Sequence, residues 1–320
     1  MRAAPIRERR HTGRIAISSP GDFVLGPREA LPGAEGLLPY CLDFVRRRSV
    51  YVGGVDPEGA QDAPFYYLYL RRHATRAVSV PWEAGSLTRE TRAPIFLFSP
   101  GRCGSTLLSA LLSNAGIENV SEPDFYTQAT MALPASPYNP FRTRIAEAAA
   151  AMGRDLAGAL GASPVVKLRA ESCRAPALLV QPQERRTLFM TRGFETWARS
   201  NQRAFRNEAA KTVGKYLTAL QGYAWLWTNS LCHVVRYEEL TAEPQAAARA
   251  LGAFLGRDIS AAAVASTMKE DSQRGTPLEQ GTRGDLPGWE RRFDETMALW
   301  NSAKVRRLRE GLGADAWGAG

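Results

Sequence analysis

The stretch from residue 95 to 116, IFLFSPGRCGSTLLSALLSNAG, joins an apolar run, a glycine-containing turn and a helix-like pattern of leucines. A strand that turns sharply into a helix leaves the first backbone N–H groups of the helix without partners, and such groups bind anions. Gly101 and Gly104 allow the chain to bend and an oxyanion to approach closely. Arg102 adds a permanent charge whose planar fork suits oxyanions. The stretch therefore predicts an anion-binding loop.

The loop differs from the one that holds nucleoside triphosphates. That loop has the pattern GxxxxGK[ST], and its lysine contacts the terminal phosphates. Here Gly104 directly precedes Ser105 and Thr106, the loop is shorter, and the lysine is missing. The two hydroxyl residues can still donate to an anion, but the sequence disfavours ATP or GTP as the ligand.

Composition sets wider limits on function. The chain has 320 residues, a formal net charge of +9, 44% apolar residues and 23% charged residues, as in a globular protein with a basic surface. That charge fits a polyanionic ligand, although an arginine-rich composition explains it equally well. The four cysteines have no CxxC spacing, and the three histidines are far apart, so we expect neither a metal site nor a disulfide framework.

Targeting signals are also missing from the sequence. No apolar run approaches the roughly 20 residues that span a bilayer. The basic start MRAAPIRERRHTGR is not followed by the apolar segment of a secretory signal. We therefore expect a cytoplasmic protein without a membrane span. No motif for reading nucleic acid is present, so we expect no nucleic-acid partner.

Alternating strands and helices position the loop. Buried strands are expected at 94–100, 164–168, 186–192 and 232–240, and helices at 105–116, 141–161, 207–230, 244–256 and from about 291. This alternation predicts an α/β fold with a parallel sheet flanked by helices. Ligands of such sheets bind beyond the carboxyl ends of the strands, so the loops after residues 99, 168 and 191 should converge on one site.

Residues 1–92 lack the regular alternation of strands and helices and are predicted to be an N-terminal extension of unknown role. We expect a loosely attached basic arm over about residues 1–20, then short strands at SVYVGGV and PFYYLYLRRH. The main domain is predicted to span residues 93–320. Within it, Tyr216, Leu220, Tyr223 and Trp227 have helical spacing and are expected in the core.

The loop SPGRCGSTLLSALL resembles the 5′-phosphosulfate-binding loop of the sulfotransferases, and its arginine is similar to that of tyrosylprotein and many bacterial members. The resemblance covers roughly residues 93–295, and it implies a P-loop-like sulfotransferase fold. It also implies the donor 3′-phosphoadenosine-5′-phosphosulfate (PAPS), with no metal required. The residues it assigns to PAPS binding in this loop are Gly101, Arg102, Cys103, Gly104, Ser105 and Thr106.

Two other segments resemble the part of these enzymes that binds the 3′-phosphate. In LFMTRGFETWARSNQ, Arg192 ends a predicted strand and Ser200 follows eight residues later, which is the family's spacing. The Arg-Asp-Pro of that family motif is replaced here, because Gly193 and Phe194 follow the arginine. In GTRGDLPGWERRF, Arg283 and Gly284 match the basic-glycine pair that precedes a tryptophan.

The resemblance also implies catalytic residues. Lys167 matches the lysine near the bridging oxygen of the donor, whereas the cytosolic members' histidine two positions later is Arg169 here. Glu122 resembles the base of the tyrosylprotein branch, and Asp124 is its nearby competitor. Arg102, Glu122 and Lys167 are therefore the candidate catalytic residues. Segment VVRYEELTAEPQAAARALGAFLG is similar to a late strand-and-helix segment of the family and supports the fold.

The function that the resemblance implies is transfer of a sulfuryl group from PAPS to a hydroxyl acceptor, or, less favoured, an amine. The acceptor could be a small molecule or a peptide. Two alternatives remain open at this point: a nucleoside or small-metabolite kinase with an atypical loop, and a non-catalytic nucleotide-binding protein on the same scaffold.

Overall fold

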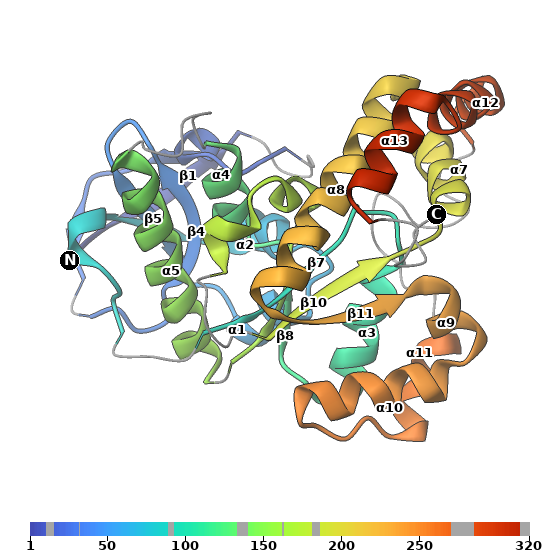
Figure 1. Cartoon of the computed structure of the whole chain (residues 1–320). Helices are drawn as coiled ribbons and strands as arrows, with labels where there is room; N and C mark the ends of the chain where they lie inside the picture. Colours follow the sequence, from blue (N-terminus) through green and yellow to red (C-terminus); the bar gives the residue numbers. More distant parts are fainter. Residues whose placement is uncertain are drawn as a thin grey trace. The chain divides into compact units, whose positions relative to one another are not determined.

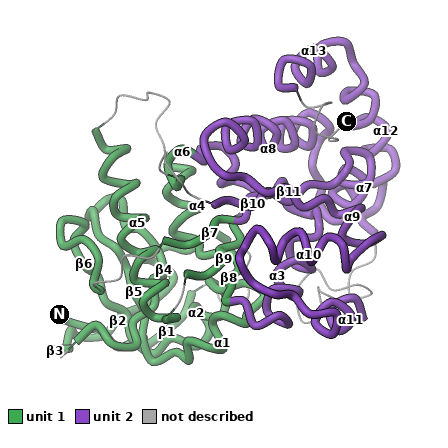
Figure 2. Tube along the Cα trace, turned by 60° about the horizontal axis from the view of Figure 1, so that its bottom comes forward, with its two compact units in different colours: residues 1–96, 118–168, 177–181 green, residues 97–117, 169–176, 182–320 purple. Residues whose placement is uncertain are grey.

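The computed structural model describes residues 1–10, 16–31, 33–88, 93–132, 140–161, 163–180, 186–269 and 285–313. The chain forms two compact units (Figure 2). The first comprises residues 1–96, 118–168 and 177–181, and the second comprises residues 97–117, 169–176 and 182–320. The first unit therefore contains the N-terminal extension together with two later segments. The boundary predicted at residue 93 stays a prediction.

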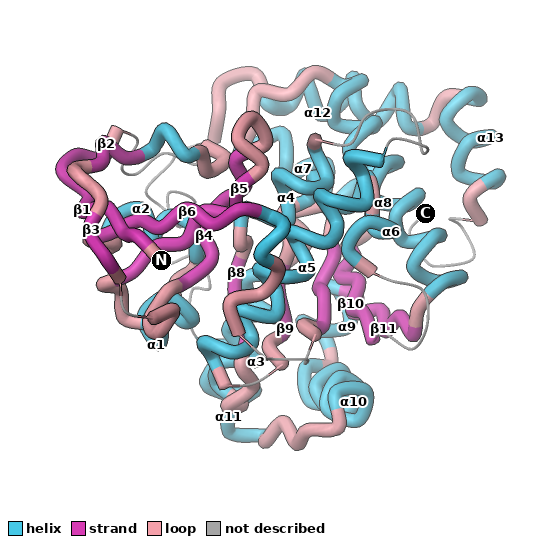
Figure 3. The backbone as a smooth tube through the Cα atoms, turned by 90° about the vertical axis from the view of Figure 1, so that its left-hand side faces the viewer, coloured by secondary structure: helices cyan, strands magenta, loops and turns pink. Residues whose placement is uncertain are grey.

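An antiparallel sheet occupies the N-terminal part of the first unit. Its strands are β1 (Arg2–Arg9), β2 (Phe23–Leu25), β3 (Glu29–Ala30), β4 (Leu38–Asp43), β5 (Arg48–Gly53) and β6 (Arg76–Pro81). They run in the order β2-β1-β6-β5-β4, with β3 paired to β1 (Figure 3). The predicted strand at SVYVGGV is β5, and its prediction is confirmed.

Two predictions for this region were wrong. Residues 2–9 are not a loose arm, because β1 pairs with β2, β3 and β6. The segment PFYYLYLRRH forms helix α2 (Tyr66–His73) instead of a strand. Its aromatic side chains favoured a strand by propensity, but Tyr66, Tyr67 and Leu70 share one buried helical face, and burial outweighs that weak preference.

Helices α4 (Asp124–Met131) and α5 (Pro140–Leu160), the second of which was predicted, pack against this sheet in the first unit. Helix α1 (Pro57–Asp62) contacts α2, α5 and β8 instead, and short 3₁₀ turns lie at Pro20–Asp22 and Trp82–Ala84. Tyr51 on β5 donates a hydrogen bond of 2.7 Å to Asp155 on α5. Gln128 on α4 accepts one from the backbone N–H of Leu42 on β4, also at 2.7 Å. These buried polar contacts fix the helices on the sheet.

A five-stranded parallel sheet flanked by helices forms the α/β part of the fold, as predicted (Figure 1). Its strands are β7 (Ile95–Phe98), β8 (Asn119–Ser121), β9 (Val165–Lys167), β10 (Arg186–Thr191) and β11 (Leu231–Arg236), in the order β11-β10-β7-β9-β8. The four predicted strands are β7, β9, β10 and β11. The last ends earlier than predicted, because a helix begins at Tyr237.

The helices of the second unit are α3 (Ser105–Asn114), α7 (Phe194–Ala204), α8 (Ala209–Asn229), α9 (Tyr237–Ala242), α10 (Pro244–Leu255), α11 (Ala261–Lys269), α12 (Trp289–Trp300) and α13 (Ala303–Gly311). A 3₁₀ turn spans Ala170–Arg174 in the same unit, whereas the short helix α6 (Pro176–Leu179) belongs mostly to the first unit. The predicted helices at 105–116, 207–230 and 244–256 are confirmed as α3, α8 and α10. On α8, Tyr216, Leu220 and Tyr223 are buried as predicted, but Trp227 is 56% exposed, so its assignment to the core was wrong.

Candidate functional site

The predicted anion-binding loop connects β7 to α3. Gly101, Arg102 and Gly104 have φ values of 71°, 56° and 91°, all in the left-handed region. That region costs a residue with a side chain about 1–2 kcal/mol, and such strain concentrates at functional sites. Gly104 is the N-cap of α3, and no side chain in the described part of the chain caps this helix end. The loop therefore presents a helix N-terminus of the kind that binds anions.

Neighbouring segments of the second unit hold the loop in shape. The backbone N–H of Gly101 donates to the Ser99 hydroxyl at 3.3 Å, and the Gly101 carbonyl accepts from the Trp197 indole N–H at 2.6 Å. A side-chain carbon at position 101 would contact Ala170 at 3.4 Å, and the Cys173 thiol donates to the Ser99 carbonyl. The segments that follow β7, β9 and β10 thus meet, as the sheet topology predicted.

Gly104 is required for a second reason. A side-chain carbon at this position would overlap the Tyr237 ring and lie 3.0 Å from the methyl group of Met190. Met190 is buried on β10, and Tyr237 begins α9 directly after β11. The loop backbone therefore approaches two neighbouring segments too closely for any residue larger than glycine.

Arg102 carries a charge that is partly withdrawn from water. Burial, and secondarily the positive charge of Arg192, lower the pKa of the Arg102 guanidinium. Its Nε is buried, and no acceptor in the described part of the chain contacts it. A guanidinium stays protonated even when its pKa falls, so the two like charges repel each other. A bound anion would relieve both the repulsion and the missing hydrogen bond.

Arg192 follows directly after β10, where the sequence placed it. The Tyr216 hydroxyl donates to its carbonyl at 2.6 Å, and its Nε donates to the Thr196 hydroxyl at 3.1 Å. Its guanidinium carbon lies 4.4 Å from the ring centroid of Tyr237, a cation–π contact. Backbone, side chain and ring therefore orient Arg192 together.

Glu238, on α9, is hydrogen-bonded to the N-terminal end of α7 beside Arg192. Its Oε1 accepts hydrogen bonds from the Gly193 backbone N–H at 3.1 Å and from the Thr196 hydroxyl at 3.2 Å. It thus occupies the end of α7 and fixes Thr196, which in turn orients Arg192. Among the described residues Glu238 forms no ion pair with Arg102 or Arg192, so it does not neutralise either guanidinium.

An aromatic cluster in the second unit supports these contacts. The rings of Phe194 and Trp300 stack with centroids 3.6 Å apart, and Tyr216 meets both rings edge-on. The ring of Trp197 lies 4.8 Å from that of Tyr216. Because Trp197 also binds the Gly101 carbonyl and Tyr216 also binds the Arg192 carbonyl, one packed cluster positions both parts of the predicted anion site.

Glu122 and Lys167 form a second pair, within the first unit. The Lys167 ammonium lies 3.6 Å from the Glu122 carboxylate, and the backbone N–H of Glu122 donates to the Lys167 carbonyl at 2.7 Å. Glu122 has a φ of 61°, so it shares with Arg102 and Arg47 a left-handed backbone that only these three non-glycine residues adopt in the described chain. The side chain of Lys167 is 3% exposed and that of Glu122 is 15% exposed.

For the other predicted site residues, the structure gives burial and position but no contact that indicates a role. Cys103 is buried, and Ser105 is buried at the first position of α3. Ser200 lies half-buried on α7, and among the described residues Thr196, not Ser200, is the hydroxyl that contacts Arg192. Arg283 and Gly284 lie outside the described residues. Their proposed contact with a 3′-phosphate stays a prediction, as does that of Ser200.

Sequence reasoning missed several supporting residues, which are Trp197, Tyr216, Tyr237 and Glu238. Tyr216 was expected only as a core residue, and Tyr237 only as part of a strand. No spacing rule connects them to the loop, because they reach it from three different helices. The tryptophan five residues after Arg192 was the one available signal, since a buried indole N–H needs an acceptor.

The strand-turn-helix at β7 and α3, in a parallel sheet, defines a P-loop-like α/β fold. No helix in the described residues has both the length and the apolar character to cross a membrane. No protein-family model and no curated protein matches the sequence significantly.

Solved structures that resemble this chain include two sulfotransferases and a retinol dehydratase. A sulfotransferase domain from the curacin biosynthetic pathway is 14% identical, with 70% of this chain and 98% of that chain covered and a TM-score of 0.42. Mouse sulfotransferase SULT7A1, complexed with PAP, is 14% identical over 72% of this chain and 91% of that chain, with a TM-score of 0.37. Retinol dehydratase, in complex with androsterone and the inactive cofactor PAP, is 13% identical over 68% of this chain and 80% of that chain, with a TM-score of 0.35.

Proposed function

We propose that the chain is a sulfotransferase that moves a sulfuryl group from PAPS to a hydroxyl acceptor. The observation that carries the proposal is the pairing of Arg102 with Arg192 beside the open N-terminus of α3. Two like charges and a row of backbone donors favour a ligand with more than one anionic group. Because the loop lacks the lysine of triphosphate sites and resembles the sulfotransferase loop, a phosphosulfate ligand is favoured over ATP.

The residues of the second unit fit such a ligand. Arg102 has a buried Nε without an acceptor, so an anionic oxygen would complete its hydrogen bonding. Gly101 and Gly104 supply the positive φ values that allow the loop backbone to turn around an oxyanion. Arg192, Ser200, Arg283 and Gly284 are proposed to hold the 3′-phosphate, and Ser105 and Thr106 to donate to the 5′ end.

PAPS would supply the activated sulfuryl group, and the chain's own residues would bind charge and move one proton. Arg102 and Lys167 are proposed to stabilise negative charge on the transferred group and on the oxygen that leaves. A single preorganised contact of this kind typically lowers the activation barrier by about 3 kcal/mol. Catalysis of this type depends mainly on position and electrostatics.

Glu122 is proposed to accept the proton that the acceptor hydroxyl loses. Lys167, 3.6 Å away, balances the carboxylate's charge, and the hydrogen bond from the Glu122 N–H fixes its backbone. Asp124 is less suited, because its side chain is fully buried and already accepts two hydrogen bonds from Ser18, at 2.7 and 3.0 Å. A buried carboxylate whose oxygen already accepts two hydrogen bonds is poorly placed to exchange a proton with a substrate.

Thermal unfolding of the full chain with 3′,5′-adenosine bisphosphate (PAP), compared with ATP and Mg²⁺, tests this proposal. PAP should raise the unfolding temperature, since a ligand that binds only the folded state stabilises it. Stabilisation by ATP–Mg²⁺ and not by PAP would favour a kinase and reject the proposal. Arg192→Ala should remove most of the PAP effect, whereas Arg249→Ala, an exposed arginine on α10, should preserve it.

The catalytic part requires a separate measurement. Glu122→Gln should retain PAP binding but lose sulfuryl transfer to a panel of alcohols, phenols and sugars that the unaltered chain sulfates. If the unaltered chain binds PAP and sulfates no acceptor, it is a non-catalytic nucleotide-binding protein. Retained transfer in Glu122→Gln would exclude Glu122 as the base.

A further inference from the structure

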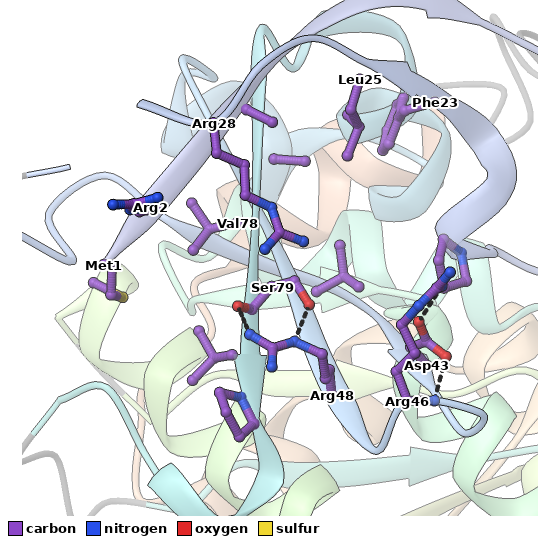
Figure 4. A pocket seen from close by; sticks show the side chains of 16 residues that line it. Met1, Arg2, Phe23, Leu25, Arg28, Asp43, Arg46, Arg48, Val78 and Ser79 are labelled. Carbon is purple, nitrogen blue, oxygen red and sulfur yellow. Dashed lines mark hydrogen bonds and ion pairs between the residues drawn. The ribbon is translucent and has the colours of Figure 1, made fainter. Parts of the chain in front are cut away.

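The antiparallel sheet of the first unit holds a cavity of about 550 Å³ that the proposed sulfuryl transfer does not use (Figure 4). Alternating residues of three strands form its floor. Arg48 and Val50 on β5 share a face of the sheet with Ser79 on β6, because Val50 pairs directly with Ser79. Ala4 on β1 pairs with Ala77 on the same strand β6 and so belongs to this face too.

This face is opposite to the one that α5 covers. Tyr51, the neighbour of Val50 along β5, points the other way and donates its hydrogen bond to Asp155 on α5. Phe23 and Leu25 of β2 complete one apolar wall of the cavity. A volume of this size is typical of sites for small organic ligands.

All the cationic side chains that line the cavity are arginines. They are Arg2, Arg28, Arg46 and Arg48, and a single acidic residue, Asp43, accompanies them. Asp43 already binds Arg46, with 3.1 Å between the carboxylate and the guanidinium. The cavity therefore keeps an excess of positive charge from the other three arginines.

Two of these arginines have no counter-charge within the described chain. Neither Arg2 nor Arg28 makes a side-chain hydrogen bond or ion pair to a described residue, and both are exposed. In Figure 4, Arg28 extends toward Val78 and Ser79 on β6. Three guanidinium groups around one space repel each other, and an anion bound among them would remove that repulsion.

Arg48 is held in place. Its Nε donates to the Ser79 hydroxyl and its Nη2 to the Ser79 carbonyl, both at 2.6 Å. Side chains that are already ordered lose less entropy when a ligand binds. Arg48 is therefore the preorganised member of the group, whereas Arg2 and Arg28 are free to close on a ligand.

We propose that this cavity binds a small amphipathic anion, with a carboxylate or sulfate head between Arg2, Arg28 and Arg48 and an apolar body against Phe23, Leu25 and Val50. Guanidinium forks match the planar or tetrahedral oxygens of such heads. The apolar wall gives no advantage to a purely polar polyanion, such as a sugar phosphate. This site is independent of the phosphosulfate site proposed above, so each can fail without the other.

Calorimetric titration of the full chain with four octyl compounds tests the proposal. Octanoate and octyl sulfate should bind with one-to-one stoichiometry, and whichever binds more tightly identifies the preferred head. Octanol and octyltrimethylammonium should bind much more weakly, because they lack the anionic group. Equal binding of all four, or no binding of either anion, would overturn the proposal.

Matched variants locate the site. Arg28→Gln and Arg2→Gln should each weaken anion binding by about tenfold, the loss typical of one charge-assisted hydrogen bond. Arg7→Gln, which removes an exposed charge from the same strand β1 outside the cavity, should leave affinity unchanged. An equal loss in Arg7→Gln would show that only the overall charge matters, and the site would be rejected.

The apolar half of the site has its own pair of variants. Leu25 is 45% exposed at the cavity wall, and Val45 is 93% exposed outside it, so neither substitution disturbs the core. Leu25→Asn should weaken octanoate binding several-fold, and Val45→Asn should have no effect. Identical affinities for the two variants would contradict an apolar body in this cavity. PAP binding should be the same in all variants.

Discussion

Two arginines, one in each unit, show how differently the fold treats a guanidinium removed from water. Arg71 on α2 is fully buried in the first unit, and acceptors surround it. Its nitrogens contact the Asp22 carboxylate at 3.3 Å, the Tyr40 hydroxyl at 3.0 Å and the Ala16 carbonyl at 3.0 Å. Burial by itself lowers the pKa of Arg71, but the contacts with Tyr40 and Asp22 outweigh burial and raise it.

Arg102 in the second unit has the opposite surroundings. Burial and the charge of Arg192 both lower its pKa, and its backbone is held in a left-handed conformation. A buried charge with satisfied partners fixes a fold, whereas an uncompensated one costs stability and persists where a ligand supplies the partner. The comparison therefore supports a structural role for Arg71 and is consistent with the binding role proposed for Arg102.

Replacing Arg71 should have the largest effect on stability. Arg71→Met leaves Asp22 and Tyr40 buried without their partner, and breaking a buried pair in this way costs about 3–5 kcal/mol. Urea denaturation should show this loss, whereas Arg72→Met, an exposed neighbour on α2, should change the free energy of unfolding by less than about 0.5 kcal/mol. A similar stability for both variants would remove the distinction between Arg71 and an ordinary surface charge.

Replacing Arg102 should have the converse outcome. Arg102→Asn removes the guanidinium while keeping a residue that tolerates the left-handed backbone. The free energy of unfolding should stay the same or rise, because an unpaired buried charge is lost. PAP affinity should fall by about two orders of magnitude, which corresponds to about 3 kcal/mol. A clear loss of stability with unchanged PAP binding would make Arg102 a structural residue, like Arg71.

This contrast also marks what sequence could and could not predict. The loop from 99 to 106 could be predicted because its shape depends on local backbone geometry: a strand, a glycine turn and a helix adjacent in sequence. Four strands of the parallel sheet were found for the same reason, since fully buried strands are continuous apolar runs. Arg192 was singled out by its resemblance to a family motif at the end of a predicted strand.

The rest depends on contacts distant in sequence. Helix α2 was mistaken for a strand because its buried face is defined by β4 and the 3₁₀ turn at Pro20–Asp22, through Arg71 and Tyr66. Strand β1 was predicted to be a loose arm because its many charged residues are not typical of a buried strand. Its pairing with β6, more than 70 residues away in the sequence, could not be predicted from that segment alone. Trp197 and Tyr237 support the site through tertiary contacts that no local pattern encodes.

Comparing substitutions at Gly104 and Gly116 separates two reasons for a glycine in the predicted binding loop: close packing against neighbouring side chains and a positive φ. Gly104 and Gly116 both have positive φ values, 91° and 67°, but only Gly104 faces the Tyr237 ring and Met190, whereas nothing lies within 4 Å of a side-chain carbon at 116. Gly104→Ala should cost about 1–3 kcal/mol more than Gly116→Ala, through overpacking. Urea midpoints measure the difference, and equal costs would show that Tyr237 can move aside.

The smallest effect on stability is expected at an exposed pair beside the predicted 3′-phosphate residues. Arg203 donates to Asp285 at 2.7 Å, and the backbone N–H of Leu286 donates to the Arg203 carbonyl at 3.3 Å. Both side chains are about half exposed, so Asp285→Asn should cost at most about 1 kcal/mol. Arg291–Glu295, an exposed pair on α12, gives the matched control through Glu295→Gln.

PAP affinity should distinguish the Arg203–Asp285 pair from the Arg291–Glu295 pair, even though the free energy of unfolding does not. Asp285 directly follows Arg283 and Gly284 in the sequence, and its ion pair ties that point of the chain to α7, the helix that follows Arg192. If Arg283 holds the 3′-phosphate, Asp285→Asn should weaken PAP binding several-fold while Glu295→Gln leaves it unchanged. Adenosine 5′-phosphate, which lacks the 3′-phosphate, should bind both variants equally. A weak surface pair affects binding here only through the residues it positions. Equal PAP affinities of the two variants would therefore show that Arg283 does not bind the 3′-phosphate, and Arg102 and Arg192 would remain the proposed binding residues.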